Sequence, residues 1–287
     1  MGNCKRMTQR TVLITGCSSG IGLCCARTLA ARGWRVFATA RKLSDMAALL
    51  AEGLEALQLD VDDSDSIAAA VTEVLKRSGG TLDALFNNGA YGLPGAVEDL
   101  TRAALRAQFE TNLFGWLELT NRIIPIMRAQ GHGRIVMNSS VLGFIALPYR
   151  GAYTATKFAL EGLSDTLRME LAGSGIHVSL IEPGPIHTHF RANAHTAFKR
   201  WINPNDSAHQ AQYAAQERRL TSVAPAGAFT RPPEAVCEKL IHALESRRPR
   251  ARYRVTVPTH VFAWLKRILP SGILDRALRR AGGGGAR

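Results

Sequence analysis

Short runs of β-branched and other apolar residues alternate along this chain with longer stretches of helical periodicity. Strands joined through helices form βαβ units, which make a sheet parallel and cover both of its faces. The sequence therefore predicts an α/β fold, a single doubly wound (Rossmann-type) domain with a mostly parallel seven-stranded sheet. The predicted strands are residues 11–15, 35–40, 54–59, 84–87, 134–138, 177–181 and 253–257.

The alternation is interrupted between residues 188 and 230, where we expect a helical lid over a substrate. A chain of 287 residues fits one α/β domain. We therefore expect residues 1–287 to form a single domain. Its parts would be a dinucleotide-binding core (10–187 and 231–258), a substrate-binding lid (188–230) and a basic amphipathic tail (259–287).

Positive charge is concentrated in the C-terminal part of the chain. The formal net charge is +13, and residues 247–287 hold eleven Lys or Arg and one acid. This distribution argues against a nucleic-acid-binding body and favours a local role for the tail near acidic lipid or an acidic partner. Helical spacing of Val261, Leu265 and Ile268 predicts an amphipathic helix that contacts a membrane peripherally or, alternatively, covers the substrate cleft or a neighbouring subunit.

The sequence also bears on the cellular compartment. No apolar run reaches the roughly 18 residues of a membrane span, and the N-terminus carries no export signal. The cysteine count of five is odd, and the adjacent Cys24 and Cys25 cannot readily pair. We therefore expect a cytoplasmic protein with reduced thiols.

A glycine-rich loop lies directly between the first predicted strand and the helix that follows. Glycines let a backbone turn tightly beside a pyrophosphate, and a helix N-terminus supplies free N–H groups and a favourable dipole. The loop therefore indicates dinucleotide binding; the alternative is a tight turn without a ligand. The candidate residues are Gly16, Cys17, Ser18, Ser19, Gly20, Ile21 and Gly22.

The end of the second predicted strand indicates which dinucleotide binds. Folds that prefer NAD usually present an acid there to the ribose 2′-hydroxyl, but this chain has Arg41 and Lys42 and no acid. A guanidinium can grip the 2′-phosphate of NADP, with the Ser18 hydroxyl as a second contact. The expected cofactor is NADP(H), although these two residues could instead begin a solvated loop.

Tyr153 and Lys157 lie one helical turn apart in a predicted helix over residues 151–171, so they share a face. A nearby ammonium favours the phenolate, which predicts a lowered tyrosine pKa suited to acid–base chemistry. Ser140 lies 13 positions before Tyr153, at the end of a predicted strand, where open parallel sheets bind ligands. The alternative is a core tyrosine beside a solvated lysine.

With these motifs together, the sequence resembles the short-chain dehydrogenase/reductase family over about residues 10–260. The family pattern contains T-G-x-x-x-G-x-G, N-N-A-G, an Asn on the central helix, S-x12-Y and Y-x-x-x-K, which occur here in the same order. Within the family, the chain looks most like bacterial NADP-dependent aldehyde reductases and next like steroid and retinol dehydrogenases. One motif departs from the pattern, because Asn87 and Asn88 are followed by Gly89 and Ala90.

The resemblance implies roles for individual residues. Tyr153 would donate the proton to the carbonyl oxygen, Lys157 would hold the nicotinamide ribose and lower the tyrosine pKa, and Ser140 would orient the carbonyl. Asn112 would hold a water that links Lys157 to solvent. Further cofactor contacts would come from Asp60, Val61, Asn88, Pro183, Gly184, Ile186 and Thr188.

The resulting prediction is an oxidoreductase that transfers hydride from NADPH to the carbonyl of a small apolar aldehyde or ketone. Alternatives are a dehydrogenase/reductase for steroid, retinoid or acyl-chain ketones and a non-catalytic NADP-binding sensor. We expect no nucleic-acid partner and a homodimer or homotetramer, as the resemblance implies. The lid aromatics Phe190, Phe198, Trp201 and Tyr213 are candidate substrate walls. No metal site is expected from His187, His189 and His195, since no carboxylate or cysteine completes a ligand set.

Overall fold

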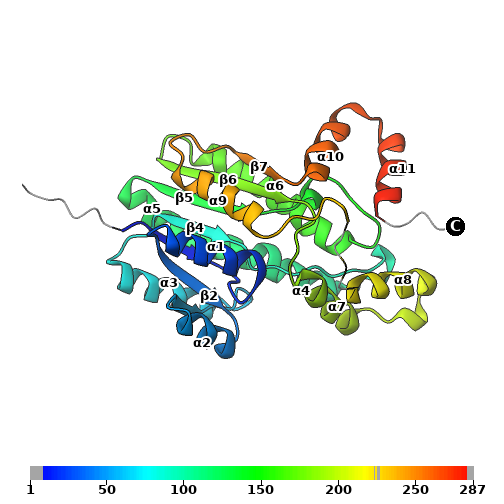
Figure 1. Cartoon of the computed structure of the whole chain (residues 1–287), viewed down its shortest axis with the longest axis horizontal. Helices are drawn as coiled ribbons and strands as arrows, with labels where there is room; N and C mark the ends of the chain where they lie inside the picture. The colour runs from blue at the N-terminus through cyan, green and yellow to red at the C-terminus, as the bar shows by residue number, and fades with distance from the viewer. Residues whose placement is uncertain (1–8, 223, 225–226, 283–287) are drawn as a thin grey trace, which may run out of the picture.

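The computed structural model describes residues 9–222, 224 and 227–282. Its strands form one sheet in the order β3-β2-β1-β4-β5-β6-β7, and each neighbouring pair is parallel (Figure 1). The predicted fold class is thereby confirmed. The strands are β1 (Thr11–Ile14), β2 (Arg35–Ala40), β3 (Glu55–Gln58), β4 (Ala84–Asn87), β5 (Gly133–Asn138), β6 (Ile176–Pro183) and β7 (Arg252–Val255).

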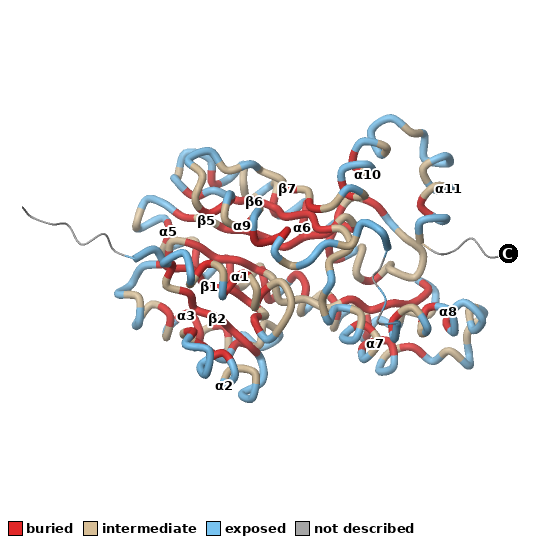
Figure 2. The backbone as a smooth tube through the Cα atoms, viewed as in Figure 1, coloured by how far each residue is buried: buried red, intermediate tan, exposed pale blue. Residues whose placement is uncertain are grey.

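Helices cover both faces of the sheet. Since successive strand residues point to opposite sides, each strand packs against helices on both faces. Val12 and Ile14 of β1 pack with α1 (Gly20–Ala31), α2 (Leu43–Ala51) and α9 (Glu234–Glu245). Leu13 between them packs with α3 (Ser64–Ser78), α5 (Gly115–Gln130) and α6 (Gly151–Glu170) on the other face. The strands therefore form the buried centre of the core, as Figure 2 shows.

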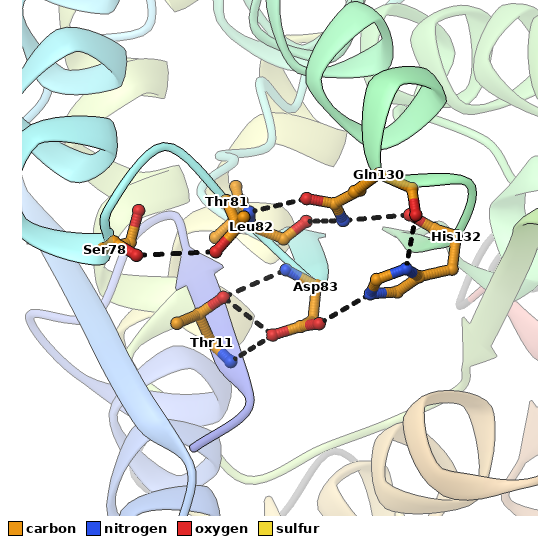
Figure 3. A network of polar contacts seen from close by, with 7 residues as sticks. All are labelled: Thr11, Ser78, Thr81, Leu82, Asp83, Gln130 and His132. Atoms are coloured by element: carbon orange, nitrogen blue, oxygen red, sulfur yellow. Dashed lines mark hydrogen bonds and ion pairs between the residues drawn. The ribbon is translucent and has the colours of Figure 1, made fainter. Parts of the chain in front are cut away.

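A polar network holds together the edge of the sheet where the strands begin (Figure 3). The carboxylate of Asp83, just before β4, accepts hydrogen bonds from the Thr11 backbone N–H at 2.7 Å and from the Thr11 hydroxyl at 2.9 Å. It also contacts Nε2 of His132 at 2.9 Å. The side-chain amide of Gln130 accepts a hydrogen bond from the Leu82 backbone N–H and donates one to the Leu82 carbonyl. These contacts fix the relative starts of β1, β4 and β5, opposite the edge that carries the candidate site.

The lid and the tail both extend from the carboxyl edge of the sheet (Figure 1). The lid follows β6 and contains α7 (Phe190–Trp201) and α8 (Gln210–Thr221), which pack near α4 (Arg102–Phe109). The tail follows β7 directly. Within the part of the chain that the structure describes, no helix is long and apolar enough to cross a membrane.

The amphipathic tail is divided into two helices, α10 (Val257–Ile268) and α11 (Ser271–Ala281). Pro270 follows the break, and Leu269 is extended with φ −86° and ψ 135° because a residue before proline is kept out of the helical region. The start of the tail also differs. The last strand ends at Val255 rather than at residue 257, since Thr256 has φ 84°, which strands do not accommodate.

Candidate active site

The glycine loop between β1 and α1 packs against the segment that follows β4. Gly16 has φ +70°, and a Cβ there would lie 2.5 Å from Cα of Gly89. The Thr15 hydroxyl accepts hydrogen bonds from the backbone N–H of Asn88 at 2.8 Å and of Gly89 at 2.9 Å. Gly89, where the family pattern has alanine, thus contributes to this close approach of two backbones.

The amino end of α1 fits a phosphate group. Its N-cap residue Ser19 makes no side-chain capping hydrogen bond, and Gly20 has φ +58°. A Cβ at Gly20 would lie 3.1 Å from Thr188, so the Pro183–Thr188 segment lies against this loop. Cys17 differs from its neighbours, because its backbone N–H already donates to the Thr39 carbonyl at 2.7 Å. Its buried thiol supports the loop from beneath.

The remaining residues expected at the adenosine end lie at the ends of β2 and β3. Arg41 and Lys42 are exposed directly after β2, and Ser18 is exposed in the glycine loop. Asp60 and Val61 are half-buried after β3. A Cβ at Gly115 would lie 1.9 Å from the Val61 carbonyl oxygen, so the start of α5 packs tightly against this turn.

Asn88 connects the glycine loop to the next part of the site. Its side-chain amide donates to the carbonyls of Thr15 at 3.0 Å and Gly16 at 3.2 Å. Its Oδ1 accepts a hydrogen bond from Asn138 Nδ2 at 2.9 Å. The Asn138 carbonyl in turn accepts a hydrogen bond from Lys157 Nζ at 2.7 Å. Asn88 therefore positions the loop and is linked to Lys157 through one residue.

Tyr153 and Ser140 come together at the carboxyl edge of β5. Burial raises the pKa of Tyr153 to about 12, and a hydrogen bond with Ser140 offsets part of that rise. Ser140 Oγ also accepts from the Leu142 backbone N–H at 3.1 Å. The expectation that the tyrosine pKa is lowered is therefore wrong in this structure. Desolvation of the phenolate outweighs the stabilising contacts.

Lys157 is fully buried beneath Tyr153. Its ammonium nitrogen lies 4.3 Å from the Trp116 ring centroid and 5.6 Å from that of Tyr153. Burial lowers the pKa of Lys157 to about 7, and Glu161 opposes that change. The lysine thus carries less charge near neutral pH than a solvated one, which explains why it does not lower the pKa of Tyr153.

Asn112 lies in a π-helical segment, Glu110–Phe114, that connects α4 to α5. Its side chain exchanges two hydrogen bonds with the Tyr91 backbone, at 2.8 and 3.2 Å, and donates to the Thr156 hydroxyl at 3.3 Å. Both ends of the Asn112 side chain are therefore used within the protein. A π-bulge is frequently found at functional sites, where it changes which backbone groups are paired.

The segment after β6 completes the edge of the site. A Cβ at Gly184 would lie 2.2 Å from Oγ1 of Thr256, so only glycine fits beside the start of the tail. Ile186 is held by a bridge to Arg231, and Pro183 is buried. Thr188 Oγ1 accepts from the backbone N–H of Phe190, the first residue of the lid helix.

The four lid aromatics have different surroundings. The Phe190 ring meets the Tyr153 ring edge-on, with 5.4 Å between centroids, and is the nearest contact for a Cβ at Gly92. Phe198 and Tyr213 instead lie in the core between the lid and α4, and Trp201 packs against that core. Phe190 is therefore the one of these four that touches the candidate catalytic tyrosine.

Sequence reasoning missed a buried ionic cluster behind Lys157. Arg252 contacts Glu161 and Glu182, each at 3.1 Å. Burial, reinforced by the neighbouring Glu161, raises the pKa of Glu182 to about 7. The spacing of Lys157 and Glu161 on one helix face could have indicated that Glu161 lies near Lys157, whereas Glu182 and Arg252 come from strands distant in sequence.

A doubly wound sheet with a glycine loop at its first crossover defines a nucleotide-binding class of protein. A family model described as short chain dehydrogenase matches residues 10–198. The chain belongs to this short-chain dehydrogenase/reductase family of oxidoreductases, which confirms the resemblance seen in the sequence.

Known relatives agree with this assignment. The chain is 42% identical over 274 residues to the uncharacterized oxidoreductase YbbO of Escherichia coli (strain K12), covering 96% of each protein. It is 36% identical to Homo sapiens 17-beta-hydroxysteroid dehydrogenase type 1, covering 87% of this chain and 78% of that one. A short-chain dehydrogenase structure from Streptomyces avermitilis has TM-score 0.76 and 27% identity, with 98% of this chain and 100% of that chain covered. Other structures of the fold contain NAD or NADP.

Proposed function

We propose that the protein reduces the carbonyl of an apolar aldehyde or ketone with NADPH, and that Tyr153 is the proton donor. The observation that carries the proposal is the meeting of Tyr153, Ser140 and Lys157 beside the glycine loop. A pKa of about 12 keeps Tyr153 protonated at neutral pH, so it can give its proton to a developing alkoxide. Ser140 would orient the carbonyl oxygen.

NADPH is the proposed cofactor, and it supplies the hydride when bound. The pyrophosphate would lie against the amino end of α1, and exposed Arg41, Lys42 and Ser18 would contact the 2′-phosphate. Asp60 and Val61 would border the adenine, while Ile186 and Thr188 would border the nicotinamide. Lys157 would hold the nicotinamide ribose, positioned by the Asn138 carbonyl.

The surroundings of Tyr153 favour an apolar substrate. Leu142, Ile145 and Leu278 form a buried cluster against which Tyr153 and Phe262 pack. Phe190 covers the tyrosine from the lid side. A steroid ketone is the second candidate substrate, because the resemblance to a hydroxysteroid dehydrogenase spans most of the chain.

The test is NADPH oxidation followed at 340 nm with aliphatic, aromatic and steroid carbonyls, run beside NADH. We expect NADPH-dependent turnover that falls by several orders of magnitude in Tyr153→Phe and persists in Tyr149→Phe. Tyr149 is a suitable control because its hydroxyl contacts His209 of the lid, at 3.3 Å. Cofactor binding without turnover of any carbonyl would favour a nucleotide sensor instead.

We also propose that the tail contacts anionic membrane peripherally. Val257, Val261, Trp264 and Ile268 recur at helical spacing on α10 and are 45–65% exposed. Basic side chains on the same two helices outnumber the single acid, Asp275; they are Lys266, Arg267, Arg276, Arg279 and Arg280. An exposed apolar stripe with basic neighbours is typical of helices that lie on anionic bilayers.

Assembly into a homodimer or homotetramer is proposed through α5 and α6. Phe114, directly before α5, and Phe158, Leu163 and Met169 on α6 are 41–66% exposed. Large exposed apolar side chains on surface helices are typical of a surface that binds a protein partner. Sedimentation velocity would test this, and a monomer at micromolar concentration would contradict it.

A further inference from the structure

Three arginine side chains approach one another where the lid meets the start of α6. Arg150 precedes α6, Arg191 is in the first turn of α7, and Arg219 is near the end of α8 (Figure 1). Arg150 Nη1 and Arg219 Nε donate to the same acceptor, Oε1 of the buried Gln216, at 3.0 and 3.2 Å. The two guanidinium groups therefore share one neutral oxygen.

No carboxylate neutralises this cluster among residues 9–222, 224 and 227–282. Glu217, the acid nearest to Arg219 along α8, is engaged by His195 and Lys199, each at 3.1 Å. Arg191 donates to the Ala224 carbonyl at 2.8 Å instead of to an acid. Three cations thus converge with backbone and amide oxygens as their acceptors.

Burial and the mutual repulsion of the arginines lower the pKa values of two of them. Burial lowers the pKa of Arg150 to about 9, and the nearby Arg219 and Arg191 add to that effect. Burial and Arg191 lower the pKa of Arg219 to about 10. All three side chains are half-buried, and clustered cations partly withdrawn from water destabilise a fold unless an anion compensates them. Guanidinium groups suit a carboxylate or phosphate, whose oxygens accept paired hydrogen bonds.

The cluster adjoins the candidate catalytic tyrosine through two chain segments. Arg150 is the N-cap residue of α6, three positions before Tyr153. Arg191 directly follows Phe190, whose ring meets that of Tyr153. The arginines and Tyr153 therefore belong to the same junction between the lid and the start of α6.

We infer that Arg150, Arg191 and Arg219 bind an oxyanion, a carboxylate or phosphate, at the far end of the carbonyl substrate. The inference rests on the proposed function, because it takes Tyr153 as the site of the carbonyl. The preferred substrate is then a carbonyl compound whose apolar chain ends in an anionic group. A neutral aldehyde should be reduced with a lower kcat/KM. Closing the lid on that anion neutralises the cluster.

The kinetic test compares aliphatic aldehydes that carry a terminal carboxylate with their methyl esters. We expect kcat/KM of the wild type to favour the carboxylate by roughly tenfold to a hundredfold, the range of a charged hydrogen bond. Arg219→Gln should abolish this preference, whereas Arg219→Lys should retain part of it. Arg218→Gln removes the same charge from an exposed neighbour and should keep the preference. Equal kcat/KM for both compounds in the wild type would overturn the inference.

A binding test works without turnover. Inorganic phosphate, compared with chloride at equal ionic strength, should raise the Tm of the wild type and of Arg218→Gln more than that of Arg219→Gln. If no carbonyl is reduced, the proposed function fails, and this comparison alone decides whether the arginines bind anions. Equal shifts in all three proteins would overturn the anion site. A shift that depends on Arg219 without any carboxylate preference would show a free-anion site and overturn its assignment to the substrate.

Discussion

The pKa values of the half-buried Tyr153 and the fully buried Lys157 respond to desolvation in opposite directions. Withdrawal from water raises the pKa of the phenol to about 12 and lowers that of the ammonium to about 7. Near neutral pH the tyrosine keeps its proton while the lysine exchanges one readily. If Tyr153 is the proton donor, as proposed, a group that could resupply its proton would lie one helical turn away.

Lys157 also predicts how stability depends on pH. The unfolded lysine holds its proton up to about pH 10.5, whereas the folded one releases it near pH 7. Between these values the unfolded state binds more protons, so the wild type gains stability as pH rises, by about 1.4 kcal/mol per unit. Lys157→Met lacks this slope and should be the more stable protein at pH 7.

Urea unfolding followed by circular dichroism at several pH values measures that difference. Lys76→Met is the matched control, because its side chain is 79% exposed on α3. The control should track the wild type across the range. A difference between wild type and Lys157→Met that stays constant from pH 7 to pH 10 would contradict the prediction.

The position of the Phe190 ring predicts that it limits the size of the substrate that reaches the candidate site. Its ring packs on Tyr153, and Gly92 has it as nearest neighbour, so Phe190→Ala removes a cover from the candidate site. We expect kcat/KM for a steroid ketone to rise about threefold to tenfold relative to a small aldehyde, the scale of one lost aromatic contact. Phe229→Ala, at a side chain 54% exposed, should leave the ratio unchanged. An unchanged ratio in Phe190→Ala would show that this ring does not limit access.

Residue spacing predicted which side chains meet but not their ionisation. The shared face of Tyr153 and Lys157 follows from helix geometry, and the glycines of the loop follow from backbone sterics. The pKa directions depend on desolvation by residues from several elements, which no local pattern contains. The hydrogen bonds from both ends of the Asn112 side chain to Tyr91 and Thr156 likewise depend on residues distant in sequence, so no local pattern could predict them.

At the scale of elements, the carboxyl and amino edges of the sheet have different roles. The carboxyl edge carries the loops of the candidate site, and the amino edge carries the network of Asp83, Thr11 and His132. Contacts at the amino edge hold strand starts and touch none of the candidate site residues. Stability and activity can therefore be separated by mutation.

Asp83→Ala should test this separation. It removes the acceptor for the backbone N–H and hydroxyl of Thr11, and an unsatisfied buried donor costs about 1–3 kcal/mol. We expect the free energy of unfolding to fall by that amount while kcat/KM at a permissive temperature stays within about twofold. Glu238→Ala, an exposed change on α9, is the control. A large loss of kcat/KM in the folded variant would mean that the amino edge influences the site.

Element boundaries were predictable where a local cause sets them. The limits of each predicted strand lie within two residues of those of an observed strand, because short continuous apolar runs mark buried strands. The break in the tail has a local cause in Pro270. The π-helical turn at Glu110–Phe114 has no such mark, since the packing of Asn112 against Tyr91 stabilises it. The division into core, lid and tail, and the roles of the site residues, stay predictions.

At the scale of the whole molecule, the tail has two faces with different surroundings. Phe262 and Leu278 face inward and pack with the cluster that contains Tyr153. Val261 and Trp264 face outward and are 45% and 65% exposed. The two alternatives raised by the sequence are therefore compatible: one face covers the candidate site, and the other is available to a surface.

Membrane binding predicts a specific fluorescence change. Trp34 and Trp116 are buried and Trp201 is half-buried in the lid, so Trp264, at 65% exposed, is the tryptophan best placed to report on vesicles. Anionic phosphatidylglycerol vesicles should shift the emission to the blue and sediment with the protein, and phosphatidylcholine vesicles should bind much less. The partition coefficient should fall roughly fivefold for each removed charge in Arg276→Gln, Arg279→Gln and Arg280→Gln.

Matched variants decide whether a membrane or a second subunit covers the exposed apolar stripe of α10. Trp264→Ser should abolish the blue shift and weaken sedimentation, whereas Leu43→Ser, at an equally exposed apolar side chain on α2, should do neither. A second copy of the chain is the competing occupant, but it would bring the basic side chains of two tails together, which like-charge repulsion disfavours. If Trp264→Ser lowers the sedimentation coefficient of the protein alone and vesicles bind neither form, the stripe is a subunit interface and membrane contact is ruled out.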